Sequence, residues 1–212
     1  MVCGLCQSGR VVQQARPGDP RSYFFCENCY LISVDKKCFP SGEKEKQRYL
    51  THNNGIQFQG YVDFLSRAIT PSLQFLRKGM TGLDYGCGHA PTLSRLMESH
   101  GYPCENYDPF FVKHPLDKKF DFIFSTEVFE HFFYPERELR KIKSLLNENG
   151  LLTVMTQRWK DRDHFAHWQY ARDTTHVCFY HSRTFDFICE EFGFEKLHDD
   201  GRELLILKAL EK

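Results

Sequence analysis

One short stretch, residues 81–91, constrains the fold more than any other part of the chain. It reads TGLDYGCGHAP, an apolar strand pattern that runs into two glycines and then into a helix pattern at residues 92–99. Because Gly86 and Gly88 lack a Cβ atom, the backbone there can adopt positive φ and bring N–H groups close to a ligand. A helix that begins at such a turn directs its positive end to the same place. The stretch therefore predicts a ligand site where a strand ends.

Two features separate this stretch from a dinucleotide-binding fingerprint. The third glycine of G-x-G-x-x-G, which makes room for a pyrophosphate, is replaced by Pro91. Asp84 stands two residues before the first glycine, where a negative charge suits a cationic ligand better than a diphosphate. A nicotinamide-dependent dehydrogenase is therefore disfavoured, and a sulfonium is a better match.

From Asp84 to Gly88 the stretch resembles motif I of the class I S-adenosylmethionine-dependent methyltransferases. The resemblance implies an α/β fold with a doubly wound, mostly parallel, seven-stranded Rossmann-like sheet, and S-adenosylmethionine as cofactor. It also implies that the motif contacts this cofactor through Asp84, Tyr85, Gly86, Cys87 and Gly88.

The end of the next predicted strand supplies a second carboxylate, Asp108. A carboxylate at this place can accept both hydroxyls of an adenosine ribose. Pro109 and Phe110 follow it, and we expect them to form an apolar wall against adenine. The alternative is that Asp108 and Pro109 only form a turn.

Residues 120–125 form an almost continuous apolar run, which is typical of a central parallel strand that is buried on both faces. In the methyltransferase family the loop after this strand closes the cofactor pocket, and the resemblance assigns Thr126 and Glu127 to the cofactor. His131 in the same loop is a candidate base, since its ordinary pKa is near neutral. It could instead only orient the loop.

Residues 157–180 form an insertion that holds both tryptophans and several histidines. Within it, residues 172–180 resemble a pattern of some family members, which makes Asp173 and His176 candidates to orient or deprotonate the acceptor, with Asp173 holding the imidazole tautomer. Alternatively, His176 only bonds a loop carbonyl, or it joins His164, His167 and Asp173 in a metal site. We expect the methyl acceptor to bind under this insertion.

The remaining pattern predicts the other elements of the sheet and its covering helices. Helices are expected over residues 55–69, from Thr70-Pro71 onward, and over 135–146 and 182–192; strands are expected over 151–156, 194–197 and 203–210. Ligands of such sheets bind beyond the carboxyl ends of the strands, where Asp84, Asp108 and Thr126 all fall.

Two C-x2-C pairs lie in the first thirty residues, formed by Cys3, Cys6, Cys26 and Cys29. Four thiolates with this spacing are typical of a zinc ribbon, and a site closed by four cysteines is structural rather than catalytic. The binding free energy of Zn²⁺ then stabilises a segment too small to fold by burial. Two disulfides, or a ribbon without metal, are the alternatives.

The composition becomes polar and charged after the cysteines, which predicts a boundary. We expect a zinc ribbon at 1–40, a linker with covering helices at 41–78 and the methyltransferase domain at 79–212. The segment that enters the catalytic domain often folds over the cofactor in similar methyltransferases, so Tyr49 and His52 are candidates to line its site, along with Arg48 and Asn53.

The formal net charge is zero, so no overall field attracts nucleic acid or anionic lipid. With no long apolar run or secretory pattern, we expect a cytoplasmic protein that does not enter a membrane. A small-molecule acceptor for O-, N- or C-methylation is favoured. The alternatives are an RNA methyltransferase that grips nucleic acid with the ribbon, and a non-enzymatic cofactor-binding protein.

Overall fold

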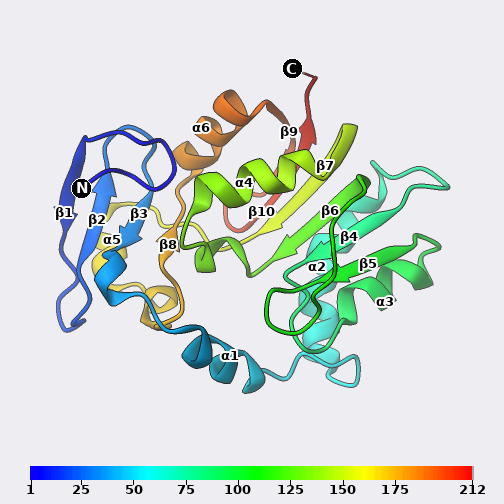
Figure 1. The fold of residues 1–212 in the computed structure, drawn as a ribbon, viewed down its shortest axis with the longest axis horizontal. Helices are drawn as coiled ribbons and strands as arrows, with labels where there is room; N and C mark the ends of the chain where they lie inside the picture. The colour runs from blue at the N-terminus through cyan, green and yellow to red at the C-terminus, as the bar shows by residue number, and fades with distance from the viewer. Residues whose placement is uncertain (212) are drawn as a thin grey trace.

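A computed structural model describes residues 1–211, which form two sheets joined by loops and helices (Figure 1). The larger sheet has the strand order β5-β4-β6-β7-β10-β9. Its strands are β4 (Gly82–Tyr85), β5 (Cys104–Tyr107), β6 (Phe120–Thr126), β7 (Leu146–Met155), β9 (Phe194–Asp199) and β10 (Leu204–Ala209). The pairs β5-β4, β4-β6 and β6-β7 are parallel, and β10 is antiparallel to both of its neighbours. This is the expected α/β architecture with a mostly parallel central sheet.

The expectation of seven strands is wrong for the described residues, because this sheet has six. The chain between β5 and β6 forms a turn, closed by a bridge between Asp108 and Val112, and then an extended loop. That segment is short and carries Pro109 and Pro115, which leaves too few residues for a further strand and its crossover helix.

Two pairs of helices cover the two faces of the larger sheet (Figure 1). One face packs against α2 (Gln59–Leu73) and α3 (Thr92–Ser99), and the other packs against α4 (Pro135–Ser144) and α6 (Ser182–Phe192). Each helix turns its apolar positions inward, as Leu65 and Met97 do on the first face and Ile142 and Phe185 on the second.

Several predicted boundaries are corrected by the structure. The helix α2 continues through Pro71, so Thr70-Pro71 does not begin a second helix. Pro71 lies in the last turn, where its missing N–H leaves one helical carbonyl without its usual donor. The strand β7 begins at Leu146 and not at residue 151. The helix α6 covers the expected residues; the His181 ring caps its start and Gly193 follows its end with φ +68°.

The smaller sheet contains β1 (Val11–Gln14), β2 (Tyr23–Cys26) and β3 (Ile32–Val34), with β8 (Cys178–Phe179) as its fourth strand. We call residues 1–40 the N-terminal module. Because β8 pairs with β3, the module's sheet is completed by the end of the insertion, far away in the sequence. Figure 1 shows this sheet beside the yellow segment that carries α5 (Arg162–His167).

The aromatic side chains of the insertion pack mainly against the N-terminal module. Trp159, Phe165 and Phe179 are buried in one cluster with Tyr23 and Phe25 of the module. Rings of Tyr23 and Phe165 meet edge to face with centroids 5.4 Å apart. The aromatic character of the insertion therefore belongs to a core that joins two distant parts of the chain.

The linker contains one further helix, α1 (Gly42–Leu50), after a 3₁₀ turn at Lys36–Cys38. It lies below the carboxyl ends of the parallel strands in Figure 1. Among residues 1–211, no helix combines the length and the apolar character that crossing a membrane requires.

Candidate active site

A cavity of about 670 Å³ lies beyond the carboxyl ends of β4, β5 and β6, where α1 covers it. Most of the residues that the sequence assigned to the cofactor line this cavity: Tyr49, His52, Tyr85, Gly86, Cys87, Gly88, Asp108, Pro109, Phe110, Thr126 and Glu127. Asp84, Arg48 and Asn53 do not line it. His131 and His176 line it as well, whereas Asp173 does not. Of the insertion at residues 157–180, only His176 lines the cavity, and binding of the methyl acceptor under the insertion stays a prediction.

The glycine turn after β4 adopts the conformation for which glycine is required. Gly86 has φ +93° and Gly88 has φ +66°, both in the left-handed region. A Cβ atom on Gly86 would lie 2.4 Å from Cγ2 of Val128. The turn therefore needs glycine both for its backbone and for the space beside the loop that follows β6.

Asp108 fixes the shape of this wall of the cavity. Its Oδ2 accepts a 3.0 Å hydrogen bond from the Gly88 N–H, and its Oδ1 accepts bonds of 2.8 and 3.1 Å from the N–H groups of Phe110 and Phe111. Asp108 therefore closes the turn that follows β5 and also lines the cavity. Its contact with ribose stays a prediction.

Asp84 lies behind the glycine turn and is only 4 % exposed. Burial, with a further contribution from the charge of Asp108, raises its pKa to about 7. Its carboxyl group therefore acts on the cavity through the electrostatic field rather than by lining the wall.

The loop after β6 carries two acidic side chains into a buried cluster, Glu127 and Glu130, in and beside the 3₁₀ turn Phe129–His131. Glu127 has φ +54°, a conformation that costs a non-glycine residue about 1 kcal/mol or more. Its Oε2 lies 3.2 Å from the Tyr170 hydroxyl oxygen, whose single proton goes to the nearer Oε1 of Glu130, and the buried Oε1 of Glu127 has no partner among residues 1–211. Burial, and then the charge of Glu130, raise the pKa of Glu127 to about 9.

His131 and His176 face each other with ring centroids 4.9 Å apart. The Nδ1 of His131 bonds the Thr175 carbonyl at 3.0 Å, and the Nδ1 of His176 bonds the Tyr170 carbonyl at 2.8 Å. Each Nδ1 must therefore carry its proton, so the Nε2 atoms hold free lone pairs when the rings are neutral. Burial lowers the pKa of His176 to about 4, which keeps that ring neutral at physiological pH.

Asp173 does not hold the His176 tautomer, which corrects the expected arrangement. Its Oδ1 accepts bonds of 2.9 and 2.6 Å from the N–H and hydroxyl of Thr175, and its Oδ2 pairs with the Arg48 guanidinium at 2.8 Å. Those donors lower the pKa of Asp173 against the opposing effect of burial. Asp173 instead connects α1 to the loop that precedes His176.

The helix α1 supplies an acid that the sequence did not point to. Glu45 lines the cavity, is 6 % exposed and accepts a 3.0 Å hydrogen bond from the Tyr49 hydroxyl. Burial raises its pKa to about 7. It was missed because the surrounding run of glutamates and lysines is typical of an exposed face, and only the tertiary structure reveals which of them is covered.

Arg21 of the N-terminal module holds the loop that carries His176. Its guanidinium donates hydrogen bonds to the carbonyls of Ala171, Asp173 and His176, and it pairs with Asp19 at 2.9 Å. The Arg21 side chain is only 9 % exposed. The module therefore forms part of the scaffold of the cavity wall.

The four cysteines of the N-terminal module come together, with a sulfur atom from each within 4.8 Å of the others. The nearest pairs, Cys3–Cys29 and Cys6–Cys26, have Sγ atoms 3.5 Å apart, which is too long for a disulfide. Both cysteine pairs sit in matching turns, since the residue after each second cysteine, Gln7 and Tyr30, has positive φ. Hydrogen bonding to Cys26 and burial raise the pKa of Cys3 to about 12. Such a cluster can bind a metal ion.

The histidines of α5 do not join a metal cluster among the described residues. His164 accepts a hydrogen bond from the Lys160 N–H and His167 is exposed, and neither lines the cavity. His176 instead clusters with Glu130 and His131.

Comparisons with known proteins agree with this fold. A magnesium protoporphyrin IX methyltransferase of Synechocystis, solved with S-adenosylhomocysteine, matches with 13 % identity over 82 % of this chain and 97 % of its own, at a TM-score of 0.56. An O-methyltransferase family protein of Burkholderia thailandensis matches with 14 % identity over 79 % of this chain and 63 % of its own, at 0.54. A methyltransferase of Archaeoglobus fulgidus matches with 19 % identity over 71 % and 94 %, at 0.52.

No curated protein matches the chain at a significant level. The model of a methyltransferase domain family matches residues 56–199, which is more than half of the chain and spans the larger sheet as far as β9. The chain therefore belongs to this methyltransferase domain family and is an S-adenosylmethionine-dependent methyltransferase.

Proposed function

We propose that the cavity binds S-adenosylmethionine against the glycine turn and transfers its methyl group to a small molecule at the end formed by Glu127, His131 and His176. The observation that carries this proposal is the unpartnered Oε1 of Glu127, a buried acceptor in a cavity that also meets the glycine turn. A buried polar atom without a partner is costly, so a ligand that supplies one is favoured.

The residues present fit this cofactor. A Cβ atom on Gly88 would have Asn54 Nδ2, 3.9 Å away, as its nearest neighbour, so the backbone of the turn is open to a ligand at this point. Carboxylate oxygens have more lone pairs than the three N–H groups on Asp108 use, so Asp108 can also accept ribose hydroxyls. Phe110 and Pro109 supply an apolar wall for adenine, and Tyr49 of the linker lies beside it, with its ring centroid 5.7 Å from that of Phe110.

The charge of the cavity also supports a cationic ligand. Asp84, Glu45 and Glu127 have raised pKa values because burial disfavours their charged forms. A cation in the cavity stabilises those charged forms, so its binding is coupled to the release of protons from these acids. The cofactor supplies an activated methyl group, and catalysis then depends mainly on holding the acceptor at the correct distance and excluding water.

The acceptor end suits a small molecule. At this end of the cavity, the Nε2 atoms of His131 and His176 are free and can take a proton from a hydroxyl or amine. The RNA alternative receives less support, because the guanidinium groups of Arg16 and Arg21 in the module are nearly buried and bond carbonyls of the insertion. Those charges are not available to phosphates.

We further infer that Cys3, Cys6, Cys26 and Cys29 hold a structural Zn²⁺. Four cysteines leave no open coordination position, so this ion would stabilise the module rather than take part in the reaction. Because β8 completes the module's sheet, the ion would also stabilise the strand that follows His176.

A labelling experiment tests the class of acceptor. The protein is incubated with S-adenosylmethionine labelled on the methyl group, together with separated small-molecule and RNA fractions of cells. We expect label to enter the small-molecule fraction and to stay out of RNA, with His176→Ala as the inactive control. Transfer of label to RNA alone would contradict the proposal.

A further inference from the structure

We propose that Glu130, His131 and His176 bind a divalent metal ion, Zn²⁺ in the first instance, at the acceptor end of the cavity. One ligand atom from each of the three lies within 4.8 Å of the other two, and all three residues line the cavity. The four-cysteine cluster of the N-terminal module meets the same distance condition. One carboxylate with two imidazoles is a donor set that transition-metal ions of intermediate softness prefer.

Each of the two imidazoles keeps one ring nitrogen that can bind a metal ion. Their Nδ1 atoms are bound to the carbonyls of Thr175 and Tyr170, which leaves Nε2 on each ring without a hydrogen-bond partner among residues 1–211. In metal sites the second ring nitrogen commonly bonds a carbonyl in this way, which fixes the tautomer and the ring plane. One such ring is enough for a catalytic base, whereas this site holds two, with ring centroids 4.9 Å apart. A pair of imidazoles is better explained by a metal ion.

The carboxylate of Glu130 is held by two hydroxyl groups. Thr156 donates to its Oε2 at 2.8 Å, and Tyr170 donates to its Oε1. Glu130 is fully buried, yet no Lys or Arg side chain pairs with it among residues 1–211. Glu127 brings a second carboxyl group to the same Tyr170 hydroxyl and leaves its Oε1 without a partner. A divalent cation at this point stabilises the carboxylates of Glu130 and Glu127 and lies close to the unpartnered Oε1 of Glu127.

Three protein ligands leave at least one coordination position open toward the cavity. If the proposed function holds, that position takes a hydroxyl oxygen of the acceptor, and the ion lowers the pKa of that hydroxyl. Because both Nε2 atoms then bind the ion, the histidines do not act as bases: the O–H proton leaves to water, the oxygen forms a bond to the methyl carbon, and the carbon–sulfur bond breaks. The products are a methyl ether and S-adenosylhomocysteine, so the site favours hydroxyl acceptors over amines.

Calorimetric titration of Zn²⁺ into the purified full-length protein, with its cysteine site already filled, tests the metal site directly. We expect the wild type to bind one further equivalent, and His176→Ala and Glu130→Gln to bind it about 100-fold more weakly or worse. The matched control is His167→Ala, which removes an exposed histidine of α5 and should bind like the wild type. No further equivalent in the wild type, or unchanged binding in both variants, would overturn the proposal.

Titration of S-adenosylhomocysteine into the same samples separates this inference from the function on which its catalytic part rests. Heat from S-adenosylhomocysteine without heat from Zn²⁺ removes the metal site and leaves the proposed cofactor site intact. Heat from Zn²⁺ without heat from S-adenosylhomocysteine leaves the metal site and removes the cofactor site. Retained S-adenosylhomocysteine binding in the variants also shows that they are folded.

Discussion

Replacement of Arg21 by methionine should separate the N-terminal module from the wall of the active site. Methionine keeps the apolar stem but removes the donors to the carbonyls of Ala171, Asp173 and His176, and it leaves Asp19 without its closest cation. Because the guanidinium is 9 % exposed, its loss breaks a nearly buried charged network. Such changes cost about 3–5 kcal/mol of the free energy of unfolding, and at about 2–4 °C per kcal/mol the midpoint falls by roughly 6–20 °C.

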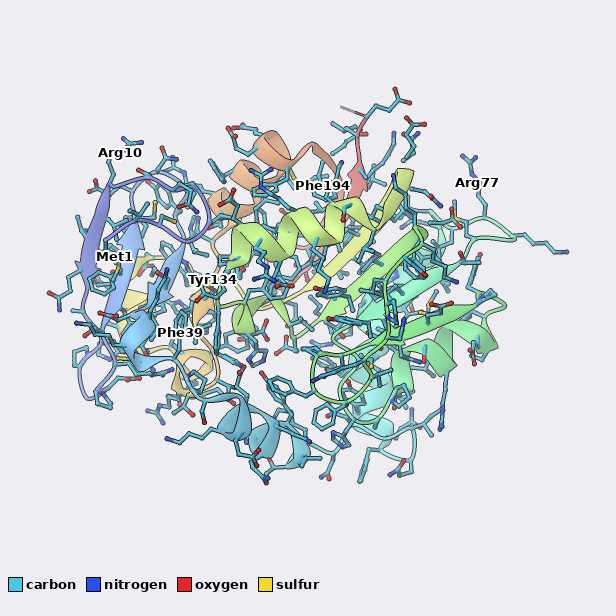
Figure 2. The ribbon with its side chains drawn as sticks, viewed as in Figure 1. Met1, Arg10, Phe39, Arg77, Tyr134 and Phe194 are labelled. Carbon is cyan, nitrogen blue, oxygen red and sulfur yellow. The ribbon has the colours of Figure 1, made fainter. Side chains whose placement is uncertain are left out.

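Tryptophan fluorescence during urea unfolding measures this loss, because both tryptophans, Trp159 and Trp168, belong to or pack against the cluster between the insertion and the module. The matched control is Arg10→Met, since Arg10 lies on the outer surface of the module (Figure 2) and its guanidinium donates a hydrogen bond to the exposed Asn28. We expect the control to change the free energy of unfolding by no more than about 0.5 kcal/mol. A loss below about 1 kcal/mol for Arg21→Met would refute the scaffold role of Arg21.

Three further changes have defined outcomes. Gly86→Ala should weaken S-adenosylhomocysteine binding at least about tenfold in calorimetry, because its Cβ would collide with Val128. The control is Gly79→Ala: Gly79 also has positive φ, but the space around it is open, so this variant should bind S-adenosylhomocysteine like the wild type. For Glu45 the folded pKa of about 7 lies above the usual 4.5, so the native state keeps a proton that the unfolded state releases, and stability falls as pH rises between these values. The free energy of unfolding of Glu45→Gln, measured by urea titration, should therefore rise relative to that of the wild type by up to about 3 kcal/mol from pH 5 to pH 8. A difference between the two proteins that does not change with pH would contradict this. A strong chelator should unfold the N-terminal module and shift the fluorescence of the tryptophans; an unchanged spectrum after loss of the metal would count against the structural role.

The local parts of the fold and cavity could be predicted from the sequence because their signals are local. The glycine turn, the acids at strand ends and the two cysteine pairs each occupy a few consecutive residues with a definite geometric requirement. That is why Gly86, Asp108, Thr126 and Glu127 reach one cavity as expected.

The parts that could not be predicted depend on long-range contacts. The insertion is aromatic because it packs on the N-terminal module, and nothing in its own composition distinguishes that partner from a substrate. Likewise, Glu45 lies in a charged run, and its burial follows only from where α1 is held by Arg48 and Asp173. The pairing of β8 with β3 is the same kind of feature, since two residues cannot signal a strand by periodicity.

The central claim is that an acid-rich cavity over the glycine turn binds a positively charged methyl donor. Calorimetry with S-adenosylmethionine, S-adenosylhomocysteine and NADH tests it most directly. We predict one molecule of S-adenosylmethionine or S-adenosylhomocysteine bound per chain and no heat from NADH. Binding of NADH, with no heat from the two sulfur compounds, would contradict the account.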